Sequence, residues 1–203
     1  MTNTHPKKEQ TLVIIKPDGI QRNLIGEIIS RFERIGLKLV AIKMMVPTSE
    51  LVEKHYTLDP EWLRIAGEKS IKNAKEKGHP VLSEIPLEVG NMVLNSLKKY
   101  LTSGPVITMI WEGVHAVSIV RKITGSTEPL TSDVGTIRGD FVIDSYQISN
   151  HDGRAIRNLV HSSGSVKEAN DEIKHWFKQE EIIKYTHIQE KILYDINIDG
   201  ILE

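Results

Sequence analysis

The chain has 203 residues, 39% of them apolar and 26% charged, and its 26 lysines and arginines nearly balance its 27 aspartates and glutamates. This composition is typical of one globular domain and excludes a collagen-like, coiled-coil or disordered chain. A formal charge of −1 gives no basic field for nucleic acid, and the lack of cysteine excludes thiol chemistry and disulfides. No apolar run approaches the roughly 20 residues of a membrane helix. We therefore expect a cytoplasmic protein that has no membrane partner, and we do not expect nucleic acid as a ligand.

Strands and helices alternate in the first half of the sequence. A continuous β-branched run at 11–15 predicts a strand buried on both faces, and residues 16–19 predict the turn that ends it. Apolar residues at helical spacing predict a helix over 24–35, with Gly36 as its C-terminal stop. Residues 37–45 predict a second strand, and residues 47–50 begin another helix.

The rest of the sequence contains two further strands and four more helices. Spacing predicts helices over 61–77 and 87–100, and a strand at 105–111 precedes a short helix over 114–123. Residues 124–140 have few apolar anchors and predict a long loop of the kind that often carries function. A brief extended piece at 158–161 then precedes a helix that Ser165 and Glu168 begin in a capping-box pattern.

This order of elements predicts an α+β fold, a ferredoxin-like βαββαβ sandwich with helices on one face of a four-stranded antiparallel sheet. We expect a single domain over 1–203, with an extended helical insertion at 58–103, a surface-loop insertion at 142–156 and a C-terminal extension at 186–203. A doubly wound sheet is the competing fold. It fits less well because strands are few and no glycine-rich turn follows the first strand.

A phosphate site in this chain would have to be built from side chains, because neither GxxxxGK[ST] nor GxGxxG occurs in the sequence. Lys16, at the end of the first strand, and Arg121, Thr127 and Arg138, in or beside the long loop, supply cations and a hydroxyl. Such groups bind phosphate oxygens well. Their spacing by itself favours four solvated surface residues over one shared site.

Among the eight histidines, His161 stands out because it lies at a strand-to-helix turn, before the polar run 162–165. A neutral imidazole there would be a competent nucleophile, and Glu172, two turns into the helix, could orient the ring. The same spacing also fits a packed or capping histidine. His55 and His79 lie in polar stretches, and no HxxxH or HExxH spacing predicts a histidine metal site.

Three signatures together identify a family. They are Lys-Pro-Asp-Gly at 16–19, Thr-Ile-Arg-Gly-Asp at 136–140 and Asn-x-x-His-x-Ser at 158–163, within ordered blocks that cover about half of the chain. In these blocks the sequence resembles nucleoside diphosphate kinase. The resemblance implies a ping-pong kinase that moves the γ-phosphoryl group of a nucleoside triphosphate such as ATP to a nucleoside diphosphate, through a phosphohistidine on His161.

The resemblance also implies a role for each matching residue. Glu172 corresponds to the glutamate that holds the other ring nitrogen of the histidine, Ser163 to a serine near that pair, and Tyr56 to a tyrosine close to the histidine. Mg²⁺ is expected on the nucleotide phosphates rather than on protein ligands, and a homo-oligomer, hexamer or tetramer, is implied. The implied nucleotide-binding residues are Lys16 and Asn158, at the sugar 3′-hydroxyl and the phosphates, and Arg121, Thr127 and Arg138, at the phosphates.

The chain departs from the family pattern in three places. The region 58–103 is longer than the family's helical hairpin, and Trp62 is a candidate for the aromatic that stacks on the nucleobase. An extra segment follows Asp140, and Ser162 and Gly164 replace the usual glycine and aspartate beside the histidine. Two alternatives stay open: an inactive relative acting as a nucleotide- or nucleic-acid-binding scaffold, and a histidine phosphocarrier that passes its phosphoryl group to a protein.

Overall fold

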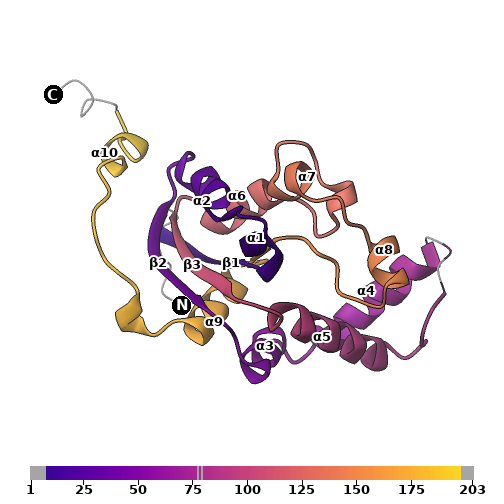
Figure 1. Cartoon of the computed structure of the whole chain (residues 1–203). Helices are drawn as coiled ribbons and strands as arrows, with labels where there is room; N and C mark the ends of the chain where they lie inside the picture. The colour runs from indigo at the N-terminus through magenta and orange to yellow at the C-terminus, as the bar shows by residue number, and fades with distance from the viewer. Residues whose placement is uncertain (1–7, 77, 79, 198–203) are drawn as a thin grey trace.

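A computed structural model describes residues 8–197 except 77 and 79 (Figure 1). Its sheet has the strand order β2-β3-β1-β4, and each neighbouring pair is antiparallel. The strands are β1 (Glu9–Ile15), β2 (Lys38–Met45), β3 (Val106–Gly113) and β4 (Val160–Ser162). This topology confirms the ferredoxin-like sandwich, and the doubly wound alternative is wrong because that fold needs parallel strands.

One face of the sheet is covered by α2 (Ile25–Glu33) and α6 (Ala116–Thr124). Their apolar residues surround Phe32 and Trp111, whose ring centroids lie 5.4 Å apart. Both side chains are fully buried. This pair of helices is the layer that the βαββαβ pattern predicts.

The opposite face of the sheet is also covered, by α3 (Ser49–Tyr56), the end of α5 (Pro86–Leu101) and α9 (Val166–Trp176). Val52, Leu101 and Trp176 from these helices pack against Leu12 and Ile14. The prediction that helices cover one face is therefore wrong. The residues of β1 from 12 to 15 are all fully buried, because alternate side chains of a strand enter the two opposite cores.

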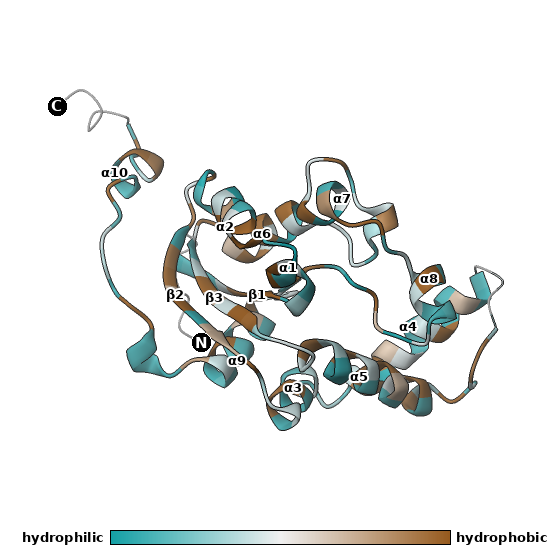
Figure 2. Ribbon diagram, in the orientation of Figure 1, coloured by the Kyte–Doolittle hydropathy of each residue, from teal (hydrophilic) through white to brown (hydrophobic). Residues whose placement is uncertain are grey.

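The predicted helical insertion is a hairpin of α4 (Trp62–Glu76) and α5, which extends beyond the sheet in Figure 1. The two helices come close at Gly67 and Gly90. A Cβ at these positions would lie 1.8 Å from the Pro86 carbonyl oxygen and 2.0 Å from that of Leu63, so only glycine fits at this crossing. Figure 2 shows hydrophilic and hydrophobic residues alternating along both helices.

Three segments predicted as turn or loop contain short helices. They are α1 (Pro17–Gln21), α7 (Ile137–Phe141), which lies with the 3₁₀ turn η2 (Pro129–Thr131) in the predicted long loop, and α8 (Tyr146–His151) in the 142–156 insertion. Thr136 and Ser145 begin α7 and α8 by accepting the Gly139 and Ile148 N–H groups. These helices are too short for apolar periodicity to reveal them.

The C-terminal segment passes the outer edge of the sheet. After η3 (Gln179–Glu181), the Ile183 N–H donates to the Val40 carbonyl at 2.9 Å and the Tyr185 hydroxyl donates to the Leu39 carbonyl at 2.9 Å. The chain then reaches α10 (Glu190–Leu193) (Figure 1), and Lys38 Nζ, at the start of β2, donates to Glu190 Oε1 at 2.8 Å. Residues 198–203 of the predicted extension lie outside the described residues, and the assignment of 1–203 to one domain stays a prediction. No helix among the described residues is long and apolar enough to cross a membrane.

Candidate active site

The candidate site lies where β4 joins the sheet beside β1. The antiparallel register places His161 opposite Ile14. Ile14 points into the core under α3 and α9, so His161 points to that face, whereas its neighbour Val160 enters the opposite core. β4 thereby places His161 beside α3 and α9, the helices that hold its neighbours in the site.

The turn before β4 is held in an unusual conformation at Leu159, whose φ is 63°. A left-handed non-glycine residue costs of order 1–3 kcal/mol and persists where surrounding contacts impose it. Here the Lys16 N–H donates to the Leu159 carbonyl at 2.8 Å, and the Leu159 N–H donates to Asp18 Oδ2 at 3.3 Å. These bonds fix Asn158 and His161 against the end of β1.

His161 has a carboxylate on one ring nitrogen. Its Nε2 lies 2.7 Å from Glu172 Oε1, and Ser163 Oγ donates to Glu172 Oε2 at 2.6 Å. Glu172 and Ser163 are 2% and 0% exposed, whereas the His161 side chain keeps 15%. A carboxylate acceptor at Nε2 favours the tautomer with its proton there, which leaves the Nδ1 lone pair available to an electrophile.

The surroundings keep the His161 ring neutral. Burial, together with the positive charges of Lys16, Arg138 and Arg121, lowers the pKa of His161 to about 3. Burial also raises the pKa of Glu172. A neutral imidazole is the form that can act as a nucleophile, so the ring is in its reactive state at physiological pH.

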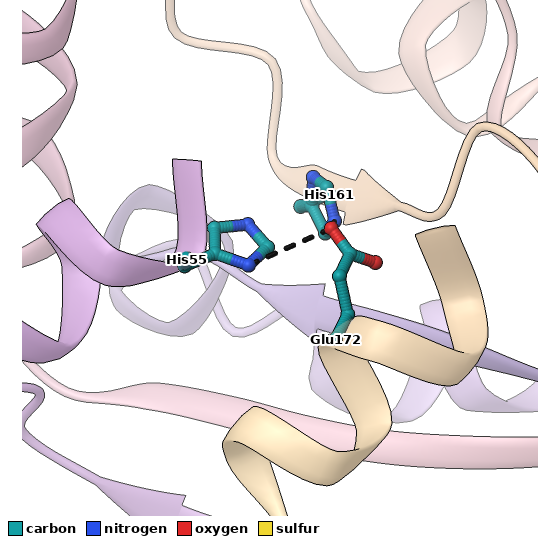
Figure 3. A group of neighbouring side chains, drawn as sticks. All are labelled: His55, His161 and Glu172. Carbon is teal, nitrogen blue, oxygen red and sulfur yellow. Dashed lines mark hydrogen bonds and ion pairs between the residues drawn. The ribbon is translucent and has the colours of Figure 1, made fainter. Parts of the chain in front are cut away.

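His55 is a site residue that the sequence analysis missed. Its ring lies edge-on to that of His161 with centroids 4.5 Å apart, and its Nδ1 lies 3.5 Å from Glu172 Oε1 (Figure 3). Trp176 Nε1 donates to the same Nδ1 at 3.1 Å, so the proton of the neutral ring is on Nε2. Burial lowers the pKa of His55 to about 3. The helical spacing of Val52, His55 and Tyr56 is the signal that could have placed His55 on the buried face of its helix.

The ligand atoms of His55, His161 and Glu172 lie within 4.8 Å of one another. A metal ion there would have to break the His161–Glu172 bond and the Trp176–His55 bond. It would also meet the positive field that already depresses the pKa of His161. The group is better suited to orient a neutral imidazole through its Nε2–H than to bind a cation.

Lys16 and Asn158 form a buried bonded pair. Lys16 Nζ donates to Asn158 Oδ1 at 2.7 Å, and Asn158 Nδ2 donates to the Thr127 carbonyl at 2.8 Å. The Lys16 ammonium also lies 5.1 Å from the centroid of the Tyr100 ring. Burial and the charge of Arg138 lower the pKa of Lys16 to about 7.

Arg138 is buried and is bound mainly by main-chain oxygens. Its guanidinium makes four hydrogen bonds out of five N–H donors, which leaves one donor for a ligand. Burial lowers its pKa to about 10. Through these hydrogen bonds Arg138 connects the segment after α6 to β4. Its acceptors are the carbonyls of Asn158 at 3.2 Å, Gly125 and Ser126 at 2.9 Å each, and Val160 at 2.6 Å.

Arg121 and Thr127 lie at the exposed side of the site. Arg121 is in the last turn of α6, and its Nη1 lies 3.6 Å from where a Cβ of residue 164 would be. Thr127 follows in the same segment and accepts the Asn158 side chain through its carbonyl. The predicted phosphate ligands thus come together from α6, the segment after it, α7, and the residues just after β1 and just before β4.

Tyr56 and Trp62 continue the aromatic row that begins at His55. The Tyr56 ring centroid lies 4.7 Å from that of His55 and 5.1 Å from that of Trp62. Burial raises the pKa of Tyr56, so its hydroxyl stays protonated and can donate. Trp62 is the first residue of α4, and through Tyr56 it connects the helical insertion to the edge of the site.

Comparisons with known proteins agree with one another. The family model described as nucleoside diphosphate kinase matches residues 9–63 and 61–182. A curated nucleoside diphosphate kinase of Pyrobaculum aerophilum is 48% identical over 180 residues, which cover 87% of this chain and 98% of that protein.

Two solved structures share the fold. The crystal structure of an NDP kinase from Pyrobaculum aerophilum matches with a TM-score of 0.84 and 45% identity, over 87% of this chain and 100% of that one. A transition-state mimic of the nucleoside-diphosphate kinase from Borrelia burgdorferi, with bound vanadate and ADP, matches with a TM-score of 0.74 and 39% identity. That match covers 90% of this chain and 95% of the other.

Proposed function

This chain belongs to the nucleoside diphosphate kinase family, and from that premise we propose that it transfers the γ-phosphoryl group of a nucleoside triphosphate such as ATP to a nucleoside diphosphate through His161. The observation that carries the proposal is the Glu172 carboxylate 2.7 Å from Nε2 of His161. Because that nitrogen keeps its proton, Nδ1 of a neutral ring is the nucleophile.

The reaction has two halves. In the first, the Nδ1 lone pair forms a bond to the γ-phosphorus while the bond from that phosphorus to the bridging oxygen breaks, and the nucleoside diphosphate leaves. The Nε2 proton stays between His161 and Glu172, whose negative charge offsets the positive charge of the phosphorylated ring. In the second half, a terminal phosphate oxygen of another diphosphate attacks the phosphohistidine, and the Nδ1–phosphorus bond breaks.

The cations around His161 neutralise and align the phosphates. Phosphoryl transfer places little covalent demand on the protein, so alignment and positive charge supply most of the acceleration. Arg121, Thr127 and the free donor of Arg138 bind phosphate oxygens, and Lys16 with Asn158 binds the sugar 3′-hydroxyl and the phosphates. Mg²⁺ enters on the nucleotide phosphates as part of the substrate.

The aromatic row binds the rest of the nucleotide. Tyr56 lies next to the catalytic group and donates its hydroxyl toward the substrate, and Trp62 stacks on the nucleobase at the edge of the site. Stacking on an indole uses the face that every base has, so we expect several bases to be accepted.

The intact mass of the protein after brief incubation with ATP and Mg²⁺, followed by a GDP chase, tests this function. Wild type is expected to gain one phosphoryl group and to lose it to GDP with formation of GTP, whereas H161Q gains none. A wild type that never gains mass contradicts the kinase and leaves the scaffold alternative. A phosphoprotein that GDP cannot discharge points instead to a protein acceptor.

We further infer a homo-oligomer, hexamer or tetramer. Apolar side chains on and after the edge strand β2 support an assembly, since Ile42, Met44 and Val46 are 50%, 58% and 63% exposed. Light scattering after size-exclusion chromatography measures the mass, and a monomer at micromolar concentration contradicts this inference. The cytoplasmic location stays a prediction.

A further inference from the structure

The insertion at 142–156 is closed by a forked ion pair. Arg154 Nη1 and Nη2 donate to the two carboxylate oxygens of Asp144, at 2.7 and 3.0 Å. The Asp144 and Arg154 side chains are 10% and 25% exposed. Two parallel bonds from a guanidinium to a carboxylate fix the orientation of both groups as well as their separation. The pair therefore joins the beginning of the insertion to its end.

Asp144 also binds the segment that leads into the candidate site. Its Oδ2 accepts the Arg157 N–H at 2.7 Å, and its Oδ1 accepts the Ser145 N–H at 2.9 Å. Arg157 directly precedes Asn158 in the sequence. The bond at Arg157 thus fixes the main chain on one side of Asn158, and the bonds of Leu159 fix it on the other.

The start of the insertion binds the segment that follows α6. The Tyr146 N–H donates to Glu128 Oε1 at 3.0 Å, and the Leu130 N–H donates to the Asp144 carbonyl at 3.2 Å. Glu128 is buried and directly follows Thr127. The insertion is therefore bonded next to Thr127 as well as next to Asn158.

We propose that the insertion is a brace for the phosphate-binding residues, and that Asp144 and Arg154 are positioning residues that act through Thr127 and Asn158. This inference rests on the proposed function, which places Thr127 and Asn158 at the nucleotide. Asn158 Nδ2 donates to the Thr127 carbonyl at 2.8 Å, and the insertion connects the neighbours of both residues by a second route. A displacement of about 1 Å in an aligning group can slow a reaction by about 10²-fold, so loss of the brace has a consequence for the rate.

Single-turnover formation of phosphohistidine, measured over a range of Mg²⁺ and ATP concentrations, tests this role in R154Q. The variant removes the fork and leaves Asp144 with its two main-chain donors. D152N is the matched control, because Asp152 is the other carboxylate partner of Arg154, 3.0 Å from its Nε, and its side chain is 45% exposed.

We expect the rate at saturating nucleotide to fall by about 10-fold in R154Q, while the half-saturating ATP concentration changes by less than about 3-fold. D152N should match wild type within about 2-fold, because an exposed ion pair contributes little. R154K keeps the charge without the fork, and it is expected to recover part of the rate. Urea denaturation of the same variants gives their stability.

A brace that serves stability alone predicts a different result. R154Q would then lose stability but, as folded protein, would form phosphohistidine at the wild-type rate, and this outcome overturns the positioning role. A loss of rate in D152N equal to that in R154Q also overturns it, because the fork would then not be the cause.

A double-mutant cycle with N158A tests the route through Asn158. If the brace acts through this residue, R154Q should slow N158A by about 3-fold or less, since neighbours in one network are not additive. The full 10-fold loss of R154Q, repeated in N158A, overturns the proposed route. In each of these outcomes wild type still forms phosphohistidine. A wild type that forms none contradicts the proposed function instead.

Discussion

The two sides of the candidate site are built differently. Around His161, buried polar groups hold one another: Ser163 fixes Glu172, Glu172 fixes His161, and Arg138 binds four carbonyls. At the other side, Trp62 begins a helix that projects beyond the sheet, and its ring packs against that of Tyr56. Chemistry that depends on alignment needs side chains that are held by buried hydrogen bonds, whereas stacking on different bases tolerates a residue at the end of a projecting helix.

The largest difference in stability is expected between variants of two arginines of the site, the buried Arg138 and the exposed Arg121. R138A removes a buried guanidinium and leaves carbonyls without a donor, so we expect the free energy of unfolding to fall by about 3 kcal/mol or more. R121A removes an exposed side chain and should change that free energy by about 0.5 kcal/mol or less. Urea denaturation measures both.

Both variants should also lose phosphoryl transfer, by about 10²-fold each, because each removes a donor that we propose binds the transferring phosphoryl group. Steady-state kinetics on the folded fraction checks this. Equal losses of stability in R138A and R121A would show that the described bonds of Arg138 do not hold the site together.

The two buried histidines of the aligned side of the site make the stability of the folded protein depend on pH. His55 and His161 have pKa values of about 3 in the folded protein, below the 6.5 expected when unfolded. The unfolded chain therefore binds more protons between these values, and the folded state loses stability as pH falls below about 6.5. Each histidine contributes up to about 1.4 kcal/mol per pH unit.

Urea denaturation at several pH values between about 5 and 7, a range that spans the pKa of a histidine in the unfolded chain, measures this slope. H55Q keeps an acceptor for the Trp176 N–H and should lower the slope by about half. H175Q is a suitable control, because His175 lies on α9, the helix that carries Glu172, and its Nε2 contacts the Leu51 carbonyl at 2.8 Å. A slope that H55Q leaves unchanged would contradict a neutral, buried His55.

The smallest effect is expected at the Trp62 side. W62A removes a stacking surface, and we expect KM for nucleoside triphosphates to rise about 3–10-fold while kcat changes little. W62F should restore most of the affinity because it keeps an aromatic face. A fall in kcat at unchanged KM would instead show that Trp62 helps to align the reacting groups around His161.

Local patterns in the sequence predicted much of the fold. Buried β-branched runs and helical spacing gave β1, β2, β3, α2, α6 and α9, and the ordered signatures gave the family that the comparisons confirm. The short helices α1, α7 and α8 were missed because they are too short for periodicity to reveal: a proline begins α1, and side-chain capping bonds begin α7 and α8. The second helical layer was missed although the run at 11–15 already predicted a strand buried on both faces.

The sequence by itself determined which residue types were available for phosphoryl transfer, since signatures such as Asn-x-x-His-x-Ser are read locally. Only the tertiary structure decided what surrounds them. His55 meets His161, and Lys16 meets Asn158, through strands and helices distant in the chain. Burial then lowers the pKa of His161 and of Lys16, and no spacing predicts that, because desolvation depends on how closely the opposite layers pack.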